Sequence, residues 1–208
     1  MKADIDDLLA RIRTLEAELD ARVAERRRAF GYRMRQGRVM ISRRVQARQR
    51  ALKIGLHRYL LDSGILTILT APFIYVVVLP ILALDAFASL YQAICFRVYG
   101  LAQVRRRAYV VFDRHRLPYL NAIQKLNCLY CAYANGVLAY VAEIASRTEQ
   151  YWCPIKHAER VAGTHRRYDG FLEYGEVSDY PDSLEDQREQ LKAELEGQNA
   201  KTPPEGGA

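Results

Sequence analysis

Three cysteines and one histidine occur at spacings that metal sites use. Cys128 and Cys131 form a CxxC pair, and Cys153 is followed four positions later by His157. Three thiolates and an imidazole complete a tetrahedral ligand set for zinc, and thiolates can also hold an iron–sulfur cluster. The twenty-one residues between the two halves are close to the separation found in zinc modules. The sequence therefore predicts a metal site at these four residues, with zinc as the first expectation and an iron–sulfur cluster as the alternative.

Helix geometry opposes a single site that both halves share. If residues 131–150 form one straight helix, its rise per residue separates the halves by roughly 30 Å. A break at Asn135-Gly136 would bring the halves closer but not far enough, so a shared site also needs a further bend near residues 146–152, a second chain, or help from Cys95. Two alternatives stay open. The first is a dithiol redox pair at Cys128 and Cys131, and the second is thiols that pack as small apolar residues without a cofactor.

The element that must position these residues is an uncharged apolar run from Ile65 to Leu84. A run of about 18 or more such residues is typical of a membrane helix, because backbone groups in lipid must be paired within the segment. The wider apolar region, residues 61–98, contains Pro72 and Pro80 and has basic residues at both ends. We expect a membrane-inserted hairpin that turns between the prolines, since both basic flanks then face the cytoplasm. A single kinked span is the alternative.

Asp85 follows the apolar run and has two interpretations. An acid inside a membrane is a functional candidate, whereas an acid at the end of an apolar run marks the membrane boundary. The polar residues Ser89 and Gln92 lie shortly after it, so the sequence favours the boundary.

Positive charge is concentrated beside the apolar region. The chain has a formal net charge of +7, and residues 26–61 contain eleven Arg and one Lys but no acid. Residues 86–112 also lack acids. Such blocks favour anionic headgroups, to which each nearby Lys or Arg adds about 1 kcal/mol. Nucleic acid is disfavoured as a partner because the adjoining membrane segment already accounts for the charge. The residues expected at the membrane surface are Arg33, Arg43, Arg44, Arg48, Arg50, Arg105, Arg106 and Arg107.

Residues 1–25 are expected to form a short amphipathic helix. Its apolar residues follow the alternating three-four spacing of a heptad repeat, at Ile5, Leu8, Ile12, Leu15 and Leu19. This spacing predicts a homo-oligomer or the binding of a protein partner, with a solvated helix docked on the same chain as the alternative. Residues 26–60 are expected to continue as a basic interfacial helix with an apolar stripe.

The predicted fold is mainly α. We expect N-terminal amphipathic helices, a membrane-inserted helical hairpin or kinked span, and a cytoplasmic helical unit. In that unit a basic connector precedes a helical region that begins near Tyr119 and could be divided at Asn135-Gly136. The expected segments are 1–25 (short heptad helix), 26–60 (basic interfacial helix), 61–98 (membrane segment), 99–178 (Cys/His-containing helical unit) and 179–208 (acidic, partly disordered tail).

Two stretches around the cysteines, KLNCLYCAYANG and RTEQYWCPIKHA, resemble a family of bacterial membrane-associated proteins. The resemblance extends over residues 113–165, about a quarter of the chain. It implies a bacterial setting, and no activity or residue role follows from it. Together with the basic flanks, it favours a protein of the bacterial inner membrane whose bulk faces the cytoplasm.

The sequence contains no phosphate-binding glycine loop, nucleophile elbow or carboxylate-rich metal motif, so no reaction can be assigned from it. The first expectation is a membrane-anchored cytoplasmic protein whose cysteine/histidine metal site is structural or senses redox state. The second is a metal-free membrane scaffold or adaptor that acts through its N-terminal helix. The third is an iron–sulfur electron-transfer protein.

Overall fold

The computed structural model describes residues 2–29, 32–35, 38–41, 43–175 and 180–201. Helices account for most of these residues, which confirms the mainly α prediction. The helices are α1 (Lys2–Ala29), α2 (Arg43–Ala51), α3 (Leu56–Ser63), α4 (Ile65–Val76), α5 (Val78–Tyr91), α6 (Arg97–Tyr99), α7 (Ala122–Trp152) and α8 (Tyr180–Lys201). Two short strands, β1 (Tyr32–Arg35) and β2 (Arg38–Ile41), form an antiparallel hairpin. A π-helical turn spans Gln92–Phe96, and 3-10 turns occur at Arg106–Ala108, Arg114–Arg116 and Tyr168–Gly170.

The prediction of a single basic helix over residues 26–60 is wrong. α1 ends at Ala29, and the hairpin that follows pairs Arg35 with Arg38. α2 and α3 are separate short helices, and Gly55 is the N-cap of α3. The apolar stripe expected along one helix is therefore divided among β1, β2, α2 and α3.

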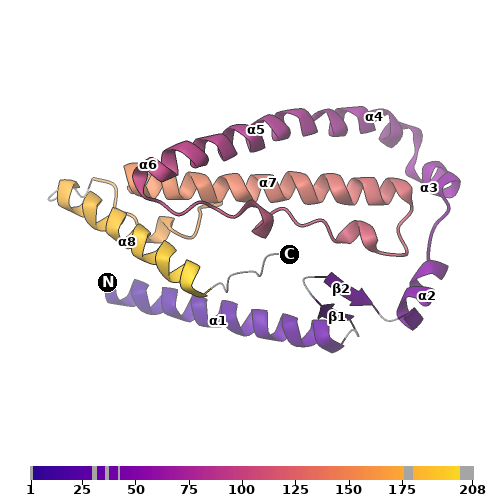
Figure 1. Cartoon of the computed structure of the whole chain (residues 1–208), viewed down its shortest axis with the longest axis horizontal. Helices are drawn as coiled ribbons and strands as arrows, with labels where there is room; N and C mark the ends of the chain where they lie inside the picture. The colour runs from indigo at the N-terminus through magenta and orange to yellow at the C-terminus, as the bar shows by residue number, and fades with distance from the viewer. Residues whose placement is uncertain (1, 30–31, 36–37, 42, 176–179, 202–208) are drawn as a thin grey trace.

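The apolar segment forms one long helix instead of a hairpin. α4, α5, the π-helical turn and α6 succeed one another from Ile65 to Tyr99, 35 residues in all, without reversing direction (Figure 1). The predicted turn between Pro72 and Pro80 is thus wrong, whereas the kinked alternative agrees with a break at Val77. Because Pro80 has no N–H to bond the carbonyl four residues earlier, the helix is interrupted near Val77 and then resumes.

α7 is continuous for 31 residues and passes through Asn135-Gly136 without a break, so the helical hairpin that the sequence allowed there is not formed. A capping box begins the helix: the Asn121 side chain accepts the N–H of Gln124, and the Gln124 side chain accepts the N–H of Asn121. A glycine inside a helix costs only about 1 kcal/mol, which the rest of a long capped helix can offset. The helix ends at Trp152, shortly before Pro154.

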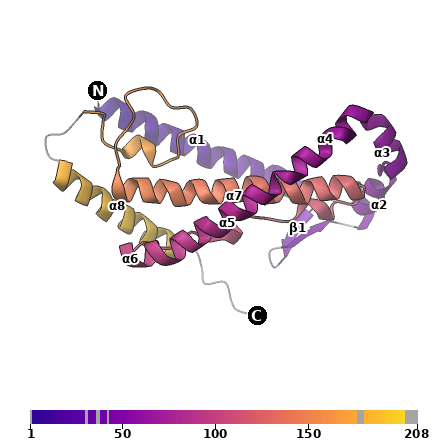
Figure 2. The same cartoon turned by 90° about the horizontal axis from the view of Figure 1, so that it is seen from above.

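The two long helices lie side by side and point in the same direction (Figures 1 and 2). Tyr75 of α4 donates a hydrogen bond to Asn127 near the start of α7, and Tyr99 of α6 stacks on Tyr151 near its end. Two consecutive parallel helices require a linking segment that returns along their whole length. Residues 100–121 are this segment and are called the connector below.

The connector runs antiparallel to both long helices. Val104 contacts Gln92, and the later residue Arg106 contacts the earlier residue Asp85. The backbone at Tyr109 and Val110 then passes over α7 at Gly136, where an added Cβ would lie 2.8 Å from the Tyr109 carbonyl oxygen and 2.9 Å from Val110 Cα. Glycine therefore permits the close approach of the connector to α7.

Two small clusters of buried side chains hold these elements together. One joins the end of the long apolar helix, the connector, α7 and α8 through Phe96, Leu101, Val104, Tyr140, Ile144, Leu191 and Leu195. The other joins α5, the connector and α7 through Ile81, Val110, Ala134 and Val137. Both clusters lie on the side of the long apolar helix that faces α7, so its remaining surface has no cover within the described chain.

Substituting Gly136 by Ala tests the close packing of the connector. Although Ala is the better helix former, its Cβ would push against backbone atoms at Tyr109 and Val110, and such overpacking costs about 1–3 kcal/mol. We expect the melting temperature of Gly136→Ala, followed by circular dichroism at 222 nm in detergent, to fall by roughly 2–8 °C. The matched control is Gly197→Ala in α8, where nothing lies within 4 Å of the added Cβ. An unchanged or higher melting temperature for Gly136→Ala would contradict the packing.

Candidate membrane-binding site

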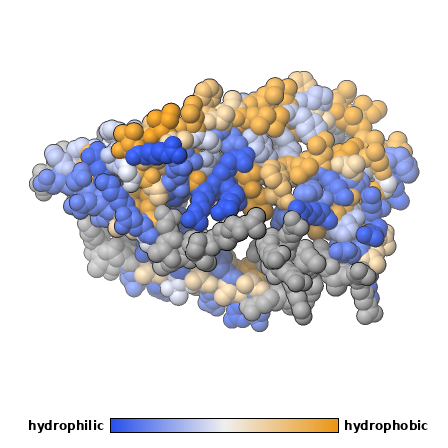
Figure 3. Space-filling model, viewed as in Figure 1, coloured by the Kyte–Doolittle hydropathy of each residue, from blue (hydrophilic) through white to orange (hydrophobic). Residues whose placement is uncertain are grey.

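The outward side of α4–α6 is a candidate site of the described chain because exposed apolar side chains follow one another along it, and it is called the apolar face below. Figure 3 shows apolar residues gathered along the edge of the molecule where Figure 1 places α4 and α5. The exposed side chains include Leu66, Leu69, Phe73, Leu79, Phe87, Leu90, Ile94 and Val98, and Leu66, Phe73 and Val98 are each more than 75 % exposed. Burying one such side chain gains about 1.5–3 kcal/mol, so a continuous face of them marks a binding surface.

A groove of about 580 Å³ between α5 and α7 extends the apolar face. Leu84, Phe87 and Ala88 line it from α5, and Val141 and Trp152 line it from α7. Trp152 is half exposed at the end of α7. Because tryptophan is enriched at the boundary between lipid and water, its position suits the edge of a membrane-contacting surface.

The inward side of the same helix carries a narrow seam of buried residues. Ile81, Asp85, Gln92 and Phe96 are buried there, and Ala88 is partly buried among them. Their spacing of three or four residues places them on one helical face. The long helix is therefore apolar on nearly all of its faces. Within the described chain, other segments of the protein cover only its inner seam.

Asp85 is tied to both neighbouring elements of the seam. Arg106 of the connector donates from Nε to Asp85 Oδ1 at 3.0 Å and from a terminal nitrogen to Oδ2 at 2.7 Å, and Tyr133 of α7 donates to Oδ2 at 2.9 Å. This hydrogen bonding to Asp85 raises the pKa of the Arg106 guanidinium further above its ordinary value. The acid predicted to mark a membrane boundary is thus an ion-pair residue that joins α5, the connector and α7.

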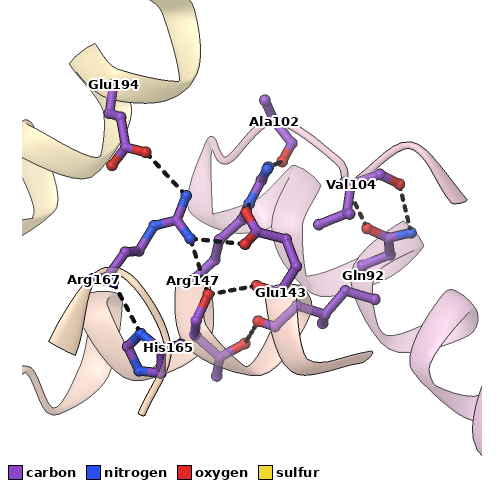
Figure 4. Close-up of polar contacts among 11 residues, drawn as sticks. Gln92, Ala102, Val104, Glu143, Arg147, His165, Arg167 and Glu194 are labelled. Atoms are coloured by element: carbon purple, nitrogen blue, oxygen red, sulfur yellow. Dashed lines mark hydrogen bonds and ion pairs between the residues drawn. The ribbon is translucent and has the colours of Figure 1, made fainter. Parts of the chain in front are cut away.

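The side chain of Gln92, which stands in an otherwise apolar stretch, forms hydrogen bonds with the backbone of the connector. Its side-chain oxygen accepts the N–H of Val104 at 2.9 Å, and its amide nitrogen donates to the Val104 carbonyl at 3.3 Å (Figure 4). The same amide nitrogen also donates to the Tyr140 hydroxyl. A buried backbone group without a partner costs about 1–3 kcal/mol. One glutamine therefore supplies both hydrogen bonds that a neighbouring strand would otherwise provide.

A charged cluster lies between α7, the connector and α8 (Figure 4). Glu143 accepts hydrogen bonds from Arg147 at 2.8 Å and from Arg167 at 2.9 Å. Arg147 also donates to the Ala102 carbonyl at 2.6 Å, and Arg167 donates to Glu194 of α8 at 3.1 Å. The cluster ties the start of the connector, the loop after α7 and α8 to one point on α7.

The basic residues predicted to contact lipid have different positions. Arg48 and Arg50 are exposed on α2, and Arg105 and Arg107 are exposed on the connector. Arg106 is partly exposed, but its guanidinium forms an ion pair with Asp85, so its first role is to stabilise the fold. The structure gives the backbone of Arg33 in β1 and of Arg43 and Arg44 in α2, while their side chains lie outside the described part.

The four predicted metal ligands are not brought together. Cys128 and Cys131 lie in the first third of α7, whereas Cys153 follows its last residue. The continuous helix between Cys131 and Cys153 spans about 33 Å. His157 stacks on Tyr168 with ring centroids 6.2 Å apart. Among the described residues, no group of three or more His, Cys, Asp or Glu side chains is placed to hold a metal ion.

Comparisons with known proteins add no further assignment. No family model, curated protein sequence or solved structure matches the chain. The site is therefore interpreted from its own geometry, and the resemblance of residues 113–165 to bacterial membrane-associated proteins stays an expectation.

Sequence reasoning missed the roles of two residues that organise the site: it interpreted Gln92 only as a sign of the membrane boundary, and it gave Arg167 no role. An isolated amide in a long apolar stretch is a signal that could have identified Gln92 as a buried hydrogen-bonding residue. Arg167 stands in a short basic run and offers no comparable signal, because its acceptors Glu143 and Glu194 are distant in sequence.

Removing the charge of Asp85 tests the ion pair. Asp85→Asn should lower the free energy of unfolding by about 1–2 kcal/mol, since charge-assisted hydrogen bonds are lost but the Arg106 side chain is 43 % exposed and partly screened. The matched control is Asp62→Asn, which breaks an exposed pair with Arg58 at 3.8 Å and should cost less than about 0.5 kcal/mol. Chemical denaturation in detergent measures both. Equal losses in the two variants would contradict the role of Asp85.

Metal analysis tests the cysteine/histidine prediction. Because α7 holds the two halves about 33 Å apart, protein purified in detergent without oxygen or chelators should contain well under one zinc or iron per chain. Plasma mass spectrometry and visible absorbance provide the measurement, and Cys131→Ser should leave the metal content unchanged. Stoichiometric metal that disappears in Cys131→Ser but persists in Cys95→Ser would show instead that a site forms, with ligands from a second chain.

Proposed function

We propose that this chain is a monotopic membrane protein: the apolar face of α4–α6 lies in the membrane surface, and the rest of the chain forms a scaffold on one side of it. The observation that carries the proposal is the course of the connector, which runs back beside the long apolar helix from Gln92 to Ile81 and then along α7. By composition and length, both Ile65–Tyr99 and α7 are long and apolar enough to cross a membrane. Their parallel direction favours a different arrangement.

Crossing the membrane would bring the connector with it. Arg106 lies level with Asp85 in the middle of the long helix, and Asp113 and Arg114 line a pocket with Asn135 of α7. If Ile65–Tyr99 crossed the bilayer, these exposed charges and the irregular connector backbone would sit at the depth of the hydrocarbon. Irregular backbone at that depth is tolerated only where protein or water surrounds it, and lipid-exposed charges are costly.

Lying along the surface resolves the conflict. A 35-residue helix is about 52 Å long, well beyond the roughly 30 Å of the hydrocarbon core. In the plane of the membrane, its outward side chains contact acyl chains along their whole length while the connector and α8 remain in water. Exposed Arg97, close to the C-terminal end of the helix, and exposed Arg105 on the connector are available for anionic headgroups.

The proposed scaffold role is based on two features of the polar side, the exposed helix α1 and the charged cluster around Glu143. α1 extends from the membrane-facing unit with its described side chains exposed, and the charged cluster around Glu143 holds α8 and the loop after α7 in place. The bacterial inner membrane, with the scaffold in the cytoplasm, is the setting that we propose from the basic flanks. Zinc or iron–sulfur binding stays a prediction of the sequence alone.

Flotation with vesicles tests membrane insertion of the apolar face. The double variant Leu69→Glu/Phe73→Glu removes two exposed apolar side chains and should weaken partitioning by at least about 100-fold, since each lost contact is worth about 1.5–3 kcal/mol. The matched control, Val161→Glu/Tyr174→Glu, changes exposed residues in the loop after α7 and should float as the unaltered chain does. Equal flotation of both variants, or unaltered chain that stays in the supernatant without detergent, would refute the proposal.

Cysteine labelling distinguishes a monotopic protein from a spanning one. Arg58→Cys on α3, just before the long apolar helix, and the native Cys153 after α7, each as the sole cysteine, report on the two ends of the long apolar helix. An impermeant maleimide should label neither site in intact spheroplasts and both after lysis. Labelling of one site but not the other before lysis would mean that the helix crosses the membrane.

A further inference from the structure

α1 carries apolar side chains that nothing in the described chain covers. Residues 7–8 and 10–26 are all exposed, including Leu8, Ile12, Leu15 and Leu19, each of which is more than half exposed. The helix touches the loop after α7 through an ion pair between Glu16 and Arg166 at 3.2 Å, and both of these side chains are exposed. A helix of 28 residues with one apolar stripe and so little tertiary contact has a binding surface available along its length.

The order of residues in the stripe favours a specific partner geometry. Ile5 and Ile12 take the a positions of a heptad, and Leu8 and Leu15 take the d positions, with Leu19 at the next a position. In parallel coiled coils, isoleucine at a combined with leucine at d favours two strands. The next d position is Arg22, which pairs with Glu18 of its own helix, so the seam ends after Leu19.

The charges beside the stripe suit a second copy of the same helix. Arg11 is at a g position and Glu16 is at the following e position, which face each other across a parallel, in-register dimer. The weak pair between Glu16 and Arg166 can be exchanged for this contact because both groups are exposed. Residues 1–25 contain seven acids and four bases, a balance that disfavours an anionic membrane as the occupant of the stripe.

We propose that α1 forms a parallel, in-register coiled coil with α1 of a second copy of this chain. The seam of this coiled coil is short, so the dimer rests on the proposed function in one respect. Attachment to a membrane confines the helices to a surface and raises their effective concentration. The dimer would join two membrane-bound scaffolds through their N-terminal helices. The partner is thus identical to the chain itself, which the sequence had left open between self-association and another protein.

Disulfide crosslinking of the full chain tests the geometry. In a background with the four native cysteines replaced by serine, Leu8→Cys places a thiol at a d position, where it meets its counterpart in a parallel dimer. We expect mild oxidation of vesicle-bound protein to yield at least tenfold more covalent dimer for Leu8→Cys than for the control Ala17→Cys, which lies at an f position away from the seam. An antiparallel pair would place Leu8 opposite Leu19, so equal or absent crosslinking of Leu8→Cys overturns the proposal.

A charge exchange provides an independent check. Arg11→Glu introduces repulsion with Glu16 of the second copy and should lower the crosslinking of Leu8→Cys several-fold. The double variant Arg11→Glu/Glu16→Arg restores opposite charges across the dimer and should restore the yield. Failure of the double variant to recover would overturn the pairing.

The failure of this inference can be distinguished from failure of membrane binding. The same variants are assayed by flotation, and we expect all of them to bind vesicles as the unaltered chain does. Crosslinking is repeated in detergent at matched protein concentrations, so the dimer is measured whether or not vesicles are bound. If the cysteine-free background does not fold, Ile12→Lys/Leu15→Lys in the otherwise native chain should halve the protein mass measured by sedimentation in detergent. An unchanged mass would overturn the dimer.

Discussion

The rest of the structure depends on the constraint that two consecutive helices point in the same direction. A polypeptide can satisfy this only by sending a connector back along both of them, and this connector has the irregular backbone that apolar surroundings tolerate least. Gln92 and Arg147 supply hydrogen bonds to its backbone, Asp85 binds Arg106, and Gly136 gives it room to approach α7. Polar side chains on otherwise apolar helices are therefore concentrated where the connector passes.

The same constraint separates the molecule into an apolar side and a polar side. The connector occupies the inner seam of the long helix, so the apolar residues left over must face outward. A chain whose apolar and charged surfaces both extend along its full length is better suited to lying on a membrane than to crossing one. The proposed membrane attachment and the course of the connector are in this sense two consequences of one topology.

The cysteines show how a continuous helix can separate residues that a sequence pattern groups together. CxxC and CxxxH spacings are compatible with a metal site when a turn or hairpin lies between them. Here the capping box at Asn121 starts a helix that continues through Gly136, so a position that looked suitable for a turn instead accommodates the connector. Glycine is required at position 136 because the connector packs closely there, and not because the chain changes direction.

The sequence by itself determined the helical class, the long apolar segment, the basic connector and the exposed heptad stripe of α1, because each depends on local periodicity and composition. It could not determine the direction of α7 relative to α5, since that choice depends on contacts such as Asp85 with Arg106 and Gln92 with Val104. It also placed a turn between Pro72 and Pro80, where the loss of one hydrogen bond only interrupts the helix. Tertiary structure decided these points because hydrogen bonds and packing between distant segments outweigh local preferences of about 1 kcal/mol per residue.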